Sequence, residues 1–201
     1  MNALSERKAL WLLFALNAAM FIIEVAAGLV ADSMSLVADG LDMLADASVY
    51  GLALLAVGNP DRDKVRAAFA AGYLQLALAC FAALKLLRAI VIGSDPEPAA
   101  MLSVSLLALT ANAVAVGVLR RHRHGDVHIR AAWIFSATDV QVNILVIAAA
   151  IFVLRWDSAV PDLVAGAVIC GLVFRSVVRI LRDARRTRAS LATTPDEPRT
   201  S

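Results

Sequence analysis

Six long apolar segments alternate with short polar ones along the chain. Each segment supplies the roughly 20 apolar residues that a helix needs to cross a bilayer. They cover residues 9–31, 34–57, 67–92, 99–119, 131–154 and 160–180. Because each segment is apolar on most faces, the pattern favours helices over the strands of a membrane barrel. Short runs containing Asp, Pro, Gly or Ser mark the breaks, the last of them at 160–162. The pattern predicts an all-α membrane protein with six transmembrane helices.

The composition points to the same class of protein. Hydrophobic residues make up 60% of the 201 residues and charged residues only 18%, too few for the polar surface of a soluble domain of this size. We expect a multi-pass integral membrane protein of a bacterial-type plasma (inner) membrane, embedded in the lipid bilayer and binding no nucleic acid. Residues 1–184 are predicted to form one transmembrane domain, and residues 185–201 a short, basic, disordered tail.

The positive charges are distributed unevenly between the two sets of predicted helix ends. Of the 19 lysines and arginines, only Lys85, Arg88 and Arg155 fall on one side. The others precede the first segment, follow the second, fourth and sixth segments, or lie near the end of the sixth. Since cytoplasmic loops of membrane proteins are enriched in Lys and Arg, this pattern predicts that both termini are cytoplasmic.

Acidic side chains interrupt the second and fifth apolar segments. Asp39, Asp42 and Asp46 are spaced three and four residues apart, so they lie on one stripe of a helix. Asp139 and Asn143, four residues apart, share a face of the fifth helix. Intramembrane carboxylates usually face the interior of a bundle and mark an ion or proton path. A pairing role is less favoured, because these two segments contain no Lys, Arg or His.

Clustered carboxylates in a bundle need a positive partner. Left without one, they repel each other and take up protons. A divalent cation removes this penalty by neutralising the charge and binding the oxygens. A site that is stable with either metal or protons meets the requirement of a metal/proton exchanger. Its place near the middle of the membrane also suits alternating access around a fixed site.

Three motifs occur in order along the chain: NAAMFIIEVAAG, ADSMSLVADGLDMLAD and PDLVAGAVICGLVFRS, with Asn112 between the last two. Together they resemble the cation diffusion facilitators, six-helix proton-coupled exporters of zinc and related metals, in a short form without the cytoplasmic C-terminal domain. The resemblance implies a secondary transporter rather than an enzyme, with no cofactor besides the transported ion. It also implies that Asp42, Asp46 and Asp139 are metal ligands.

The chain departs from the family pattern on the fifth helix. Four residues before Asp139, where the family has a second ligand, stands Phe135, which cannot bind a metal. Asn143 is the preferred replacement, because an amide carbonyl is a good hard ligand, and Ser136 is the alternative. Thr138 is less favoured, because it is expected to point a quarter-turn away. The dimerising cytoplasmic domain is also missing, so a homodimer is only the expectation from the family.

The ligand types and the family suggest different metals. Carboxylate and carbonyl ligands favour harder ions such as manganese, whereas the family implies zinc, cobalt or cadmium. Zinc is therefore the first expectation, with the other three as alternatives. The main alternative function is a non-transporting membrane regulator or partner subunit with a degenerate metal site. An intramembrane aspartyl protease is not favoured, because its Gly-x-Gly-Asp motif is absent. A phosphatidyl-alcohol transferase is not favoured either, because Asp39-Gly40 is followed by LDML.

Three features have no assigned role at this point. Glu24 lies inside the first apolar segment, where it fits either helix packing or proton relay. Asp39 lies near the outer end of the second segment. The loop before the fifth segment holds all three histidines, His122, His124 and His128. These histidines could gather metal, but the four arginines beside them favour a basic loop that fixes the topology.

Overall fold

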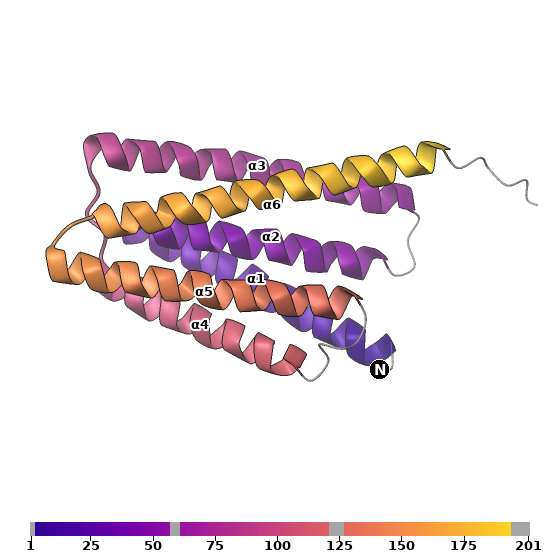
Figure 1. The fold of residues 1–201 in the computed structure, drawn as a ribbon, viewed down its shortest axis with the longest axis horizontal. Coiled ribbons are helices and arrows are strands. Elements are labelled where there is room, and N and C mark those ends of the chain that lie inside the picture. Colours follow the sequence, from indigo (N-terminus) through magenta and orange to yellow (C-terminus); the bar gives the residue numbers. More distant parts are fainter. Residues whose placement is uncertain (1–2, 57–60, 121–126, 194–201) are drawn as a thin grey trace, which may run out of the picture.

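The described part of the chain folds into six helices, each of which runs antiparallel to the one before it. The computed structural model describes residues 3–56, 61–120 and 127–193, and the side chains of residues 7–55, 65–117 and 138–189. The helices are α1 (Ala3–Val30), α2 (Met34–Ala56), α3 (Asp61–Ile92), α4 (Pro98–Arg120), α5 (Val127–Trp156) and α6 (Val160–Thr193). α1 begins and α6 ends at the same end of the bundle (Figure 1). Within these ranges there is no strand, so the all-α prediction is confirmed for them.

Helix α2 is the central element of the bundle, in contact with α1, α3, α5 and α6. Around it, α4 packs on α5, and α3 packs on α6 along the opposite side (Figure 1). A glycine allows α1 to approach α2 closely, since a Cβ atom at Gly40 would lie 2.8 Å from Val25 Cγ2 and 3.1 Å from Glu24 Cβ. Small residues at a helix interface permit this close packing in membranes. Side chains on α2 can therefore reach several neighbouring helices.

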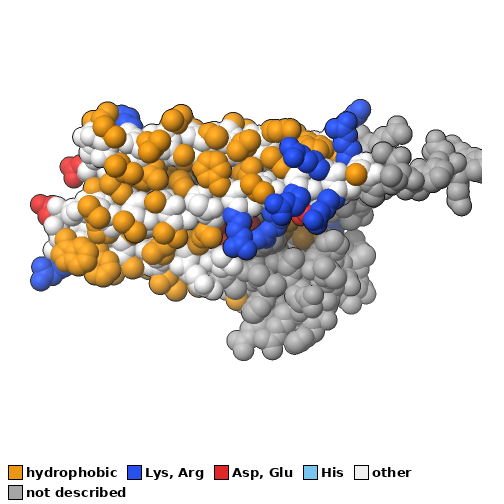
Figure 2. Space-filling model, turned by 45° about the horizontal axis from the view of Figure 1, so that its top comes forward, with side chains coloured by type: hydrophobic (Ala, Val, Ile, Leu, Met, Phe, Trp, Pro, Cys, Tyr) orange, Lys and Arg blue, Asp and Glu red, His pale blue; other side chains and the backbone are white. Residues whose placement is uncertain are grey.

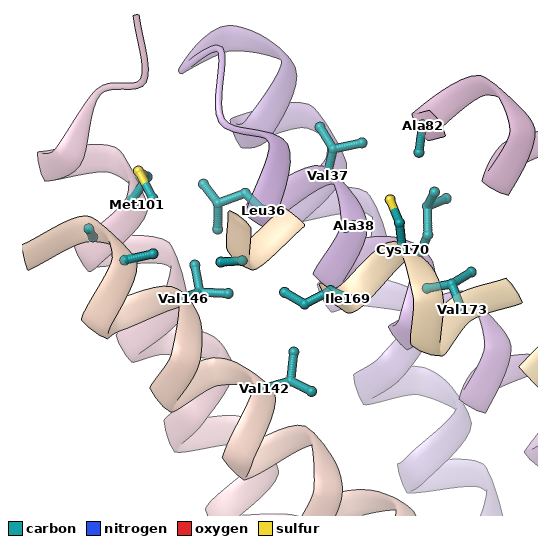
Figure 3. Packing of buried hydrophobic residues seen from close by; sticks show 14 of the residues in the cluster. Leu36, Val37, Ala38, Ala82, Met101, Val142, Val146, Ile169, Cys170 and Val173 are labelled. Atoms are coloured by element: carbon teal, nitrogen blue, oxygen red, sulfur yellow. The ribbon is translucent and has the colours of Figure 1, made fainter. Parts of the chain in front are cut away.

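The interior is formed by interlocking aliphatic side chains from five helices. Leu36 of α2, Met101 of α4, Val146 of α5 and Ile169 of α6 are buried in one cluster, to which α3 contributes Ala82 (Figure 3). Large apolar side chains also cover the outside of the bundle (Figure 2). An exposed apolar surface of this extent marks a membrane or interaction surface.

Five of the helices are long and apolar enough to cross a membrane. The spans are Arg7–Val30, Val65–Ile92, Pro98–Gly117, Thr138–Trp156 and Val160–Ala189. α2 has a similar length, but it carries Asp39, Asp42 and Asp46 in its first 13 residues. The described chain therefore has the helices of a multi-pass membrane protein, with its most acidic helix at the centre.

The helices extend beyond the apolar segments from which they were predicted. α3 begins at Asp61 rather than near residue 67, and α6 continues to Thr193 rather than ending near residue 180. The predicted boundary at residue 184 therefore falls inside α6. The division of the chain into a transport domain and a tail stays a prediction, and residues 194–201 lie outside the described part.

A buried carboxylate joins the beginnings of α2 and α6. Asp162 Oδ1 accepts hydrogen bonds from Ser33 Oγ (2.7 Å), Ser35 N (3.0 Å) and Ser35 Oγ (2.5 Å). Asp162 Oδ2 accepts a fourth from Met34 N (2.7 Å). The backbone N–H groups at the start of a helix need such an acceptor, and a negative charge there is favourable. Gly166 lies one turn further along α6, and a Cβ there would be 2.9 Å from Met34 C. We call these contacts the Asp162 clamp.

Candidate metal centre

Three carboxylates from two helices line one cavity. Asp42 and Asp46 come from α2, one turn apart, and Asp139 comes from α5. The cavity has a volume of about 240 Å³ and is closed on a third side by α6. Asp42 and Asp46 are each 8% exposed and Asp139 is 2% exposed. Asp42, Asp46 and Asp139, which the sequence singled out, therefore line one and the same pocket.

Part of the acidic surface of this cavity lacks a hydrogen-bond donor. Asp46 Oδ2 and Asp139 Oδ2 are buried and accept no hydrogen bond from the described residues. Burying a carboxylate oxygen without a partner is costly, and such oxygens need a bound cation or proton. The donor set thus fits a positively charged ligand.

The carboxylates line the cavity without forming a finished coordination shell. Among the residues described, no three His, Cys, Asp or Glu side chains are grouped closely enough to hold a metal ion. Like charges on facing helices repel each other, which favours separated positions. Binding one ion at all three aspartates therefore requires their side chains to converge.

The predicted fourth ligand, Asn143, lies one turn after Asp139 on α5 and is not among the residues that line the cavity. Its amide Nδ2 donates a hydrogen bond to the backbone carbonyl of Asp139 (2.8 Å). Its Oδ1 is buried without a hydrogen-bond partner in the described chain. Thr138, expected to point away, does line the cavity. Two side chains with oxygen atoms therefore lie near Asp139 on α5: Thr138, which lines the cavity, and Asn143, which does not.

Several sequence-based expectations fall outside the described part of the chain. These are the side chains of Phe135, Ser136 and His128, and residues His122 and His124. Their proposed roles stay predictions.

Two further carboxylates are buried next to this cavity. Glu24 on α1 and Asp39 on α2 are each 0% exposed, and all four of their oxygens lack a hydrogen-bond partner in the described structure. The Glu24 carboxyl lies within electrostatic range of Asp39, Asp139 and Asp42. Glu24 and Asp39 are thus buried acidic groups that interact electrostatically with the aspartates of the cavity.

The sequence analysis missed two residues of the cavity wall. Arg175 and Arg179 on α6 line it opposite the aspartates, with Ser176 and Leu172 between and beside them. Both arginines had been counted only as determinants of topology. Their spacing of four residues places them on one face of a helix, and this signal was available in the sequence.

Comparison with known families places the chain in context. A family model described as the cation efflux transmembrane domain matches residues 10–187, which includes parts of all six helices. No curated protein matches the chain.

Proposed function

Since this chain belongs to the cation efflux family, we propose that it is a secondary transporter that moves a divalent metal ion out of the cytoplasm in exchange for protons. The observation that carries the proposal is the cavity lined by Asp42, Asp46 and Asp139 inside the bundle. A divalent ion neutralises two of these three charges, and protons can replace the ion when it leaves. Several buried carboxylates whose charge is not balanced would otherwise destabilise a membrane bundle.

We assign the metal to Asp42, Asp46 and Asp139, with Asn143 as the fourth ligand. The unpartnered Oδ1 of Asn143 supports this choice, because a buried amide oxygen normally accepts a hydrogen bond or binds a ligand. Rotation of the Asn143 side chain would release the bond to the Asp139 carbonyl and turn the amide toward the cavity. Zinc is the first expected cargo, with cobalt, cadmium and manganese as alternatives. An all-oxygen ligand set favours the harder ions among them.

All six helices are proposed to cross the membrane, with both termini in the cytoplasm. The three aspartates set α2 apart from the five apolar spans, but they are buried between helices rather than directed to lipid. Arg7 and Lys8 of α1 lie at the same end of the bundle as the arginines of α6. This charge distribution supports a cytoplasmic location for that end. A bacterial inner membrane and a homodimer stay predictions.

Glu24 and Asp39 are proposed to carry protons between the cavity and the outer side. Both carboxyls are buried without hydrogen-bond partners in the described part, and both are electrostatically connected to Asp42. A series of protonatable groups inside a membrane bundle is a common form of proton relay.

The test is transport in liposomes that contain the purified protein and carry a pH gradient. Zinc, cobalt, cadmium and manganese are offered in turn, and metal and proton fluxes are recorded together. Asp46→Asn should lower the rate by at least ~100-fold, because even outer-shell partners of a metal are worth about 10–100-fold. Asp95→Asn is the matched control, since Asp95 is exposed in the segment between α3 and α4. Equal transport by the wild type and Asp46→Asn would exclude the proposed site.

One observation favours the alternative of a non-transporting regulator. No three potential ligands are grouped for metal binding among the described residues. A regulator of this kind would show no flux of any of the four metals in the same liposomes. Metal flux without a counterflow of protons would support the transport function but exclude the exchange of metal for protons.

A further inference from the structure

Positive side chains line a cavity that is proposed to receive a cation. Arg175 and Arg179 line the same cavity as Asp42, Asp46 and Asp139. A fixed guanidinium repels a divalent ion, and this repulsion is strong in an environment with little water. The arrangement therefore needs an explanation beyond membrane topology.

The two arginines stand at the border between two cavities. The second cavity, about 530 Å³ in volume, is lined by Arg175 and Arg179 and also by Arg182, Asp183 and Arg186. Together these side chains form the basic surface over the second half of α6 (Figure 2). Arg182 and Arg186 line only the second of the two cavities. The general enrichment of Lys and Arg on the cytoplasmic side of membrane proteins accounts for these two residues. Arg175 and Arg179 also line the cavity that holds the carboxylates.

Of the two, Arg179 is the one tied electrostatically to a proposed ligand. Its guanidinium lies within electrostatic range of the Asp46 carboxyl. Asp183, one turn further along α6, offers a second carboxylate in the neighbouring cavity. Arginine stays charged under all working conditions and has a long, flexible stem. Arg179 thus has two acidic groups in its surroundings, Asp46 in the first cavity and Asp183 in the second.

We propose that Arg179 is a tethered counter-ion of the metal cavity, which neutralises Asp46 when no metal is bound and moves toward Asp183 when metal enters. The proposal rests on the proposed function and adds a positioning residue to it. A metal ion must displace a positive charge that is already present. Arg179 therefore lowers the affinity for the cargo and stabilises the metal-free carrier, in which protons neutralise the remaining carboxylates.

The experiment is zinc transport by Arg179→Gln in the same liposomes. KM should fall roughly tenfold, because the competing positive charge is gone from a low-dielectric cavity. The maximal rate should fall too, because the empty carrier loses its counter-ion. Arg179→Lys, which keeps the charge, should restore values near those of the wild type. Arg186→Gln is the matched control on the same face of α6, and its KM should not change.

A general loss of structure would not produce this result, since it lowers the rate without lowering KM. An unchanged or higher KM in Arg179→Gln would overturn the proposal. An equal drop in KM for Arg186→Gln would overturn it as well, since a diffuse surface charge would then be responsible.

Zinc binding by calorimetry in detergent separates this proposal from the transport function. If the wild type carries no metal, the transport function fails, but the Arg179 proposal still requires tighter zinc binding by Arg179→Gln. Equal zinc affinities of the wild type and Arg179→Gln would reject the Arg179 proposal. The double variant Arg179→Gln/Asp46→Asn provides the coupling test. The gain in affinity should disappear when Asp46 is changed, and a gain of the same size would show that Arg179 does not act through Asp46.

Discussion

The Asp162 clamp allows a quantitative prediction about stability. Asp162→Asn keeps the shape of the side chain but removes its charge and one of its two acceptor atoms. In the wild type, Oδ1 serves three donors and Oδ2 serves the backbone N–H of Met34. The best placement of asparagine leaves its oxygen on the Oδ1 side, so its NH₂ group then faces the Met34 N–H. Two donors oppose each other at the start of α2.

The magnitude follows from these contacts. A hydrogen bond to a charged group contributes about 1.5–3 kcal/mol, and one of the four is lost outright. The three others change from charge-assisted to neutral bonds, and α2 loses a negative charge at its N-terminus, worth about 0.3–1 kcal/mol. Together we expect a loss of roughly 3 kcal/mol in the free energy of unfolding. At about 2–4 °C per kcal/mol for a chain of this size, the unfolding temperature should fall by about 6–12 °C.

The assay uses the two cysteines of the chain. Cys170 is buried within α6, whereas Cys80 is exposed. In a Cys80→Ala background, a thiol-reactive fluorophore should label Cys170 only as the helices separate on heating. Asp157→Asn is the matched control, because Asp157 is exposed and its φ of 50° suits asparagine. The reasoning is refuted if Asp162→Asn and Asp157→Asn unfold at the same temperature.

Two further substitutions test the packing and the proposed ligand set. Gly166→Ala should cost about 1–3 kcal/mol, because its Cβ would meet the backbone of Met34 at 2.9 Å, whereas Gly171→Ala, with nothing within 4 Å, should gain about 0.5–1 kcal/mol. The same labelling assay measures both, and equal shifts would contradict the close approach of α6 and α2. Asn143→Ala should change the free energy of unfolding by less than about 1 kcal/mol, because it removes one hydrogen bond together with one unpartnered oxygen. Its metal transport should nevertheless fall about tenfold, as expected for a partner of a metal site, and an unchanged rate would remove Asn143 from the ligand set.

The number and order of the helices and most of their ends could be predicted from the sequence, but the beginnings of α1, α3 and α5 and the end of α6 could not. Hydropathy indicates where a helix would leave the lipid, and a helix can continue beyond that point in water. α3 begins in a charged stretch at Asp61, and α6 continues through its arginines to Thr193. The run at 160–162 marks the break before the sixth segment and also forms the first turn of α6, which begins at Val160 as predicted. Proline is tolerated there because its missing N–H has no partner within the helix.

The acidic half of the site could be predicted for a physical reason. Aspartates spaced three and four residues apart share a helix face, and their cost in lipid directs that face inward. The rotation of one helix against another depends on packing, which no single segment contains. Thr138 therefore lines the cavity, whereas Asn143 does not. The spacing of Arg175 and Arg179 indicates that they share a face of α6, but that this face lines the cavity depends on how α6 packs against α2.

The Asp162 clamp also determines where α2 and α6 can separate. The two helices are joined near Met34, about 18 Å along the axis of α2 from Asp46 at 1.5 Å per residue. With this end held, the pair can act as a lever with its pivot at the clamp. A rotation of only about 10° over that length displaces Asp46 by about 3 Å, more than the length of a typical metal–oxygen bond. A small angular change, without any sliding of the helices, would therefore suffice to bring a carboxylate into or out of reach of an ion.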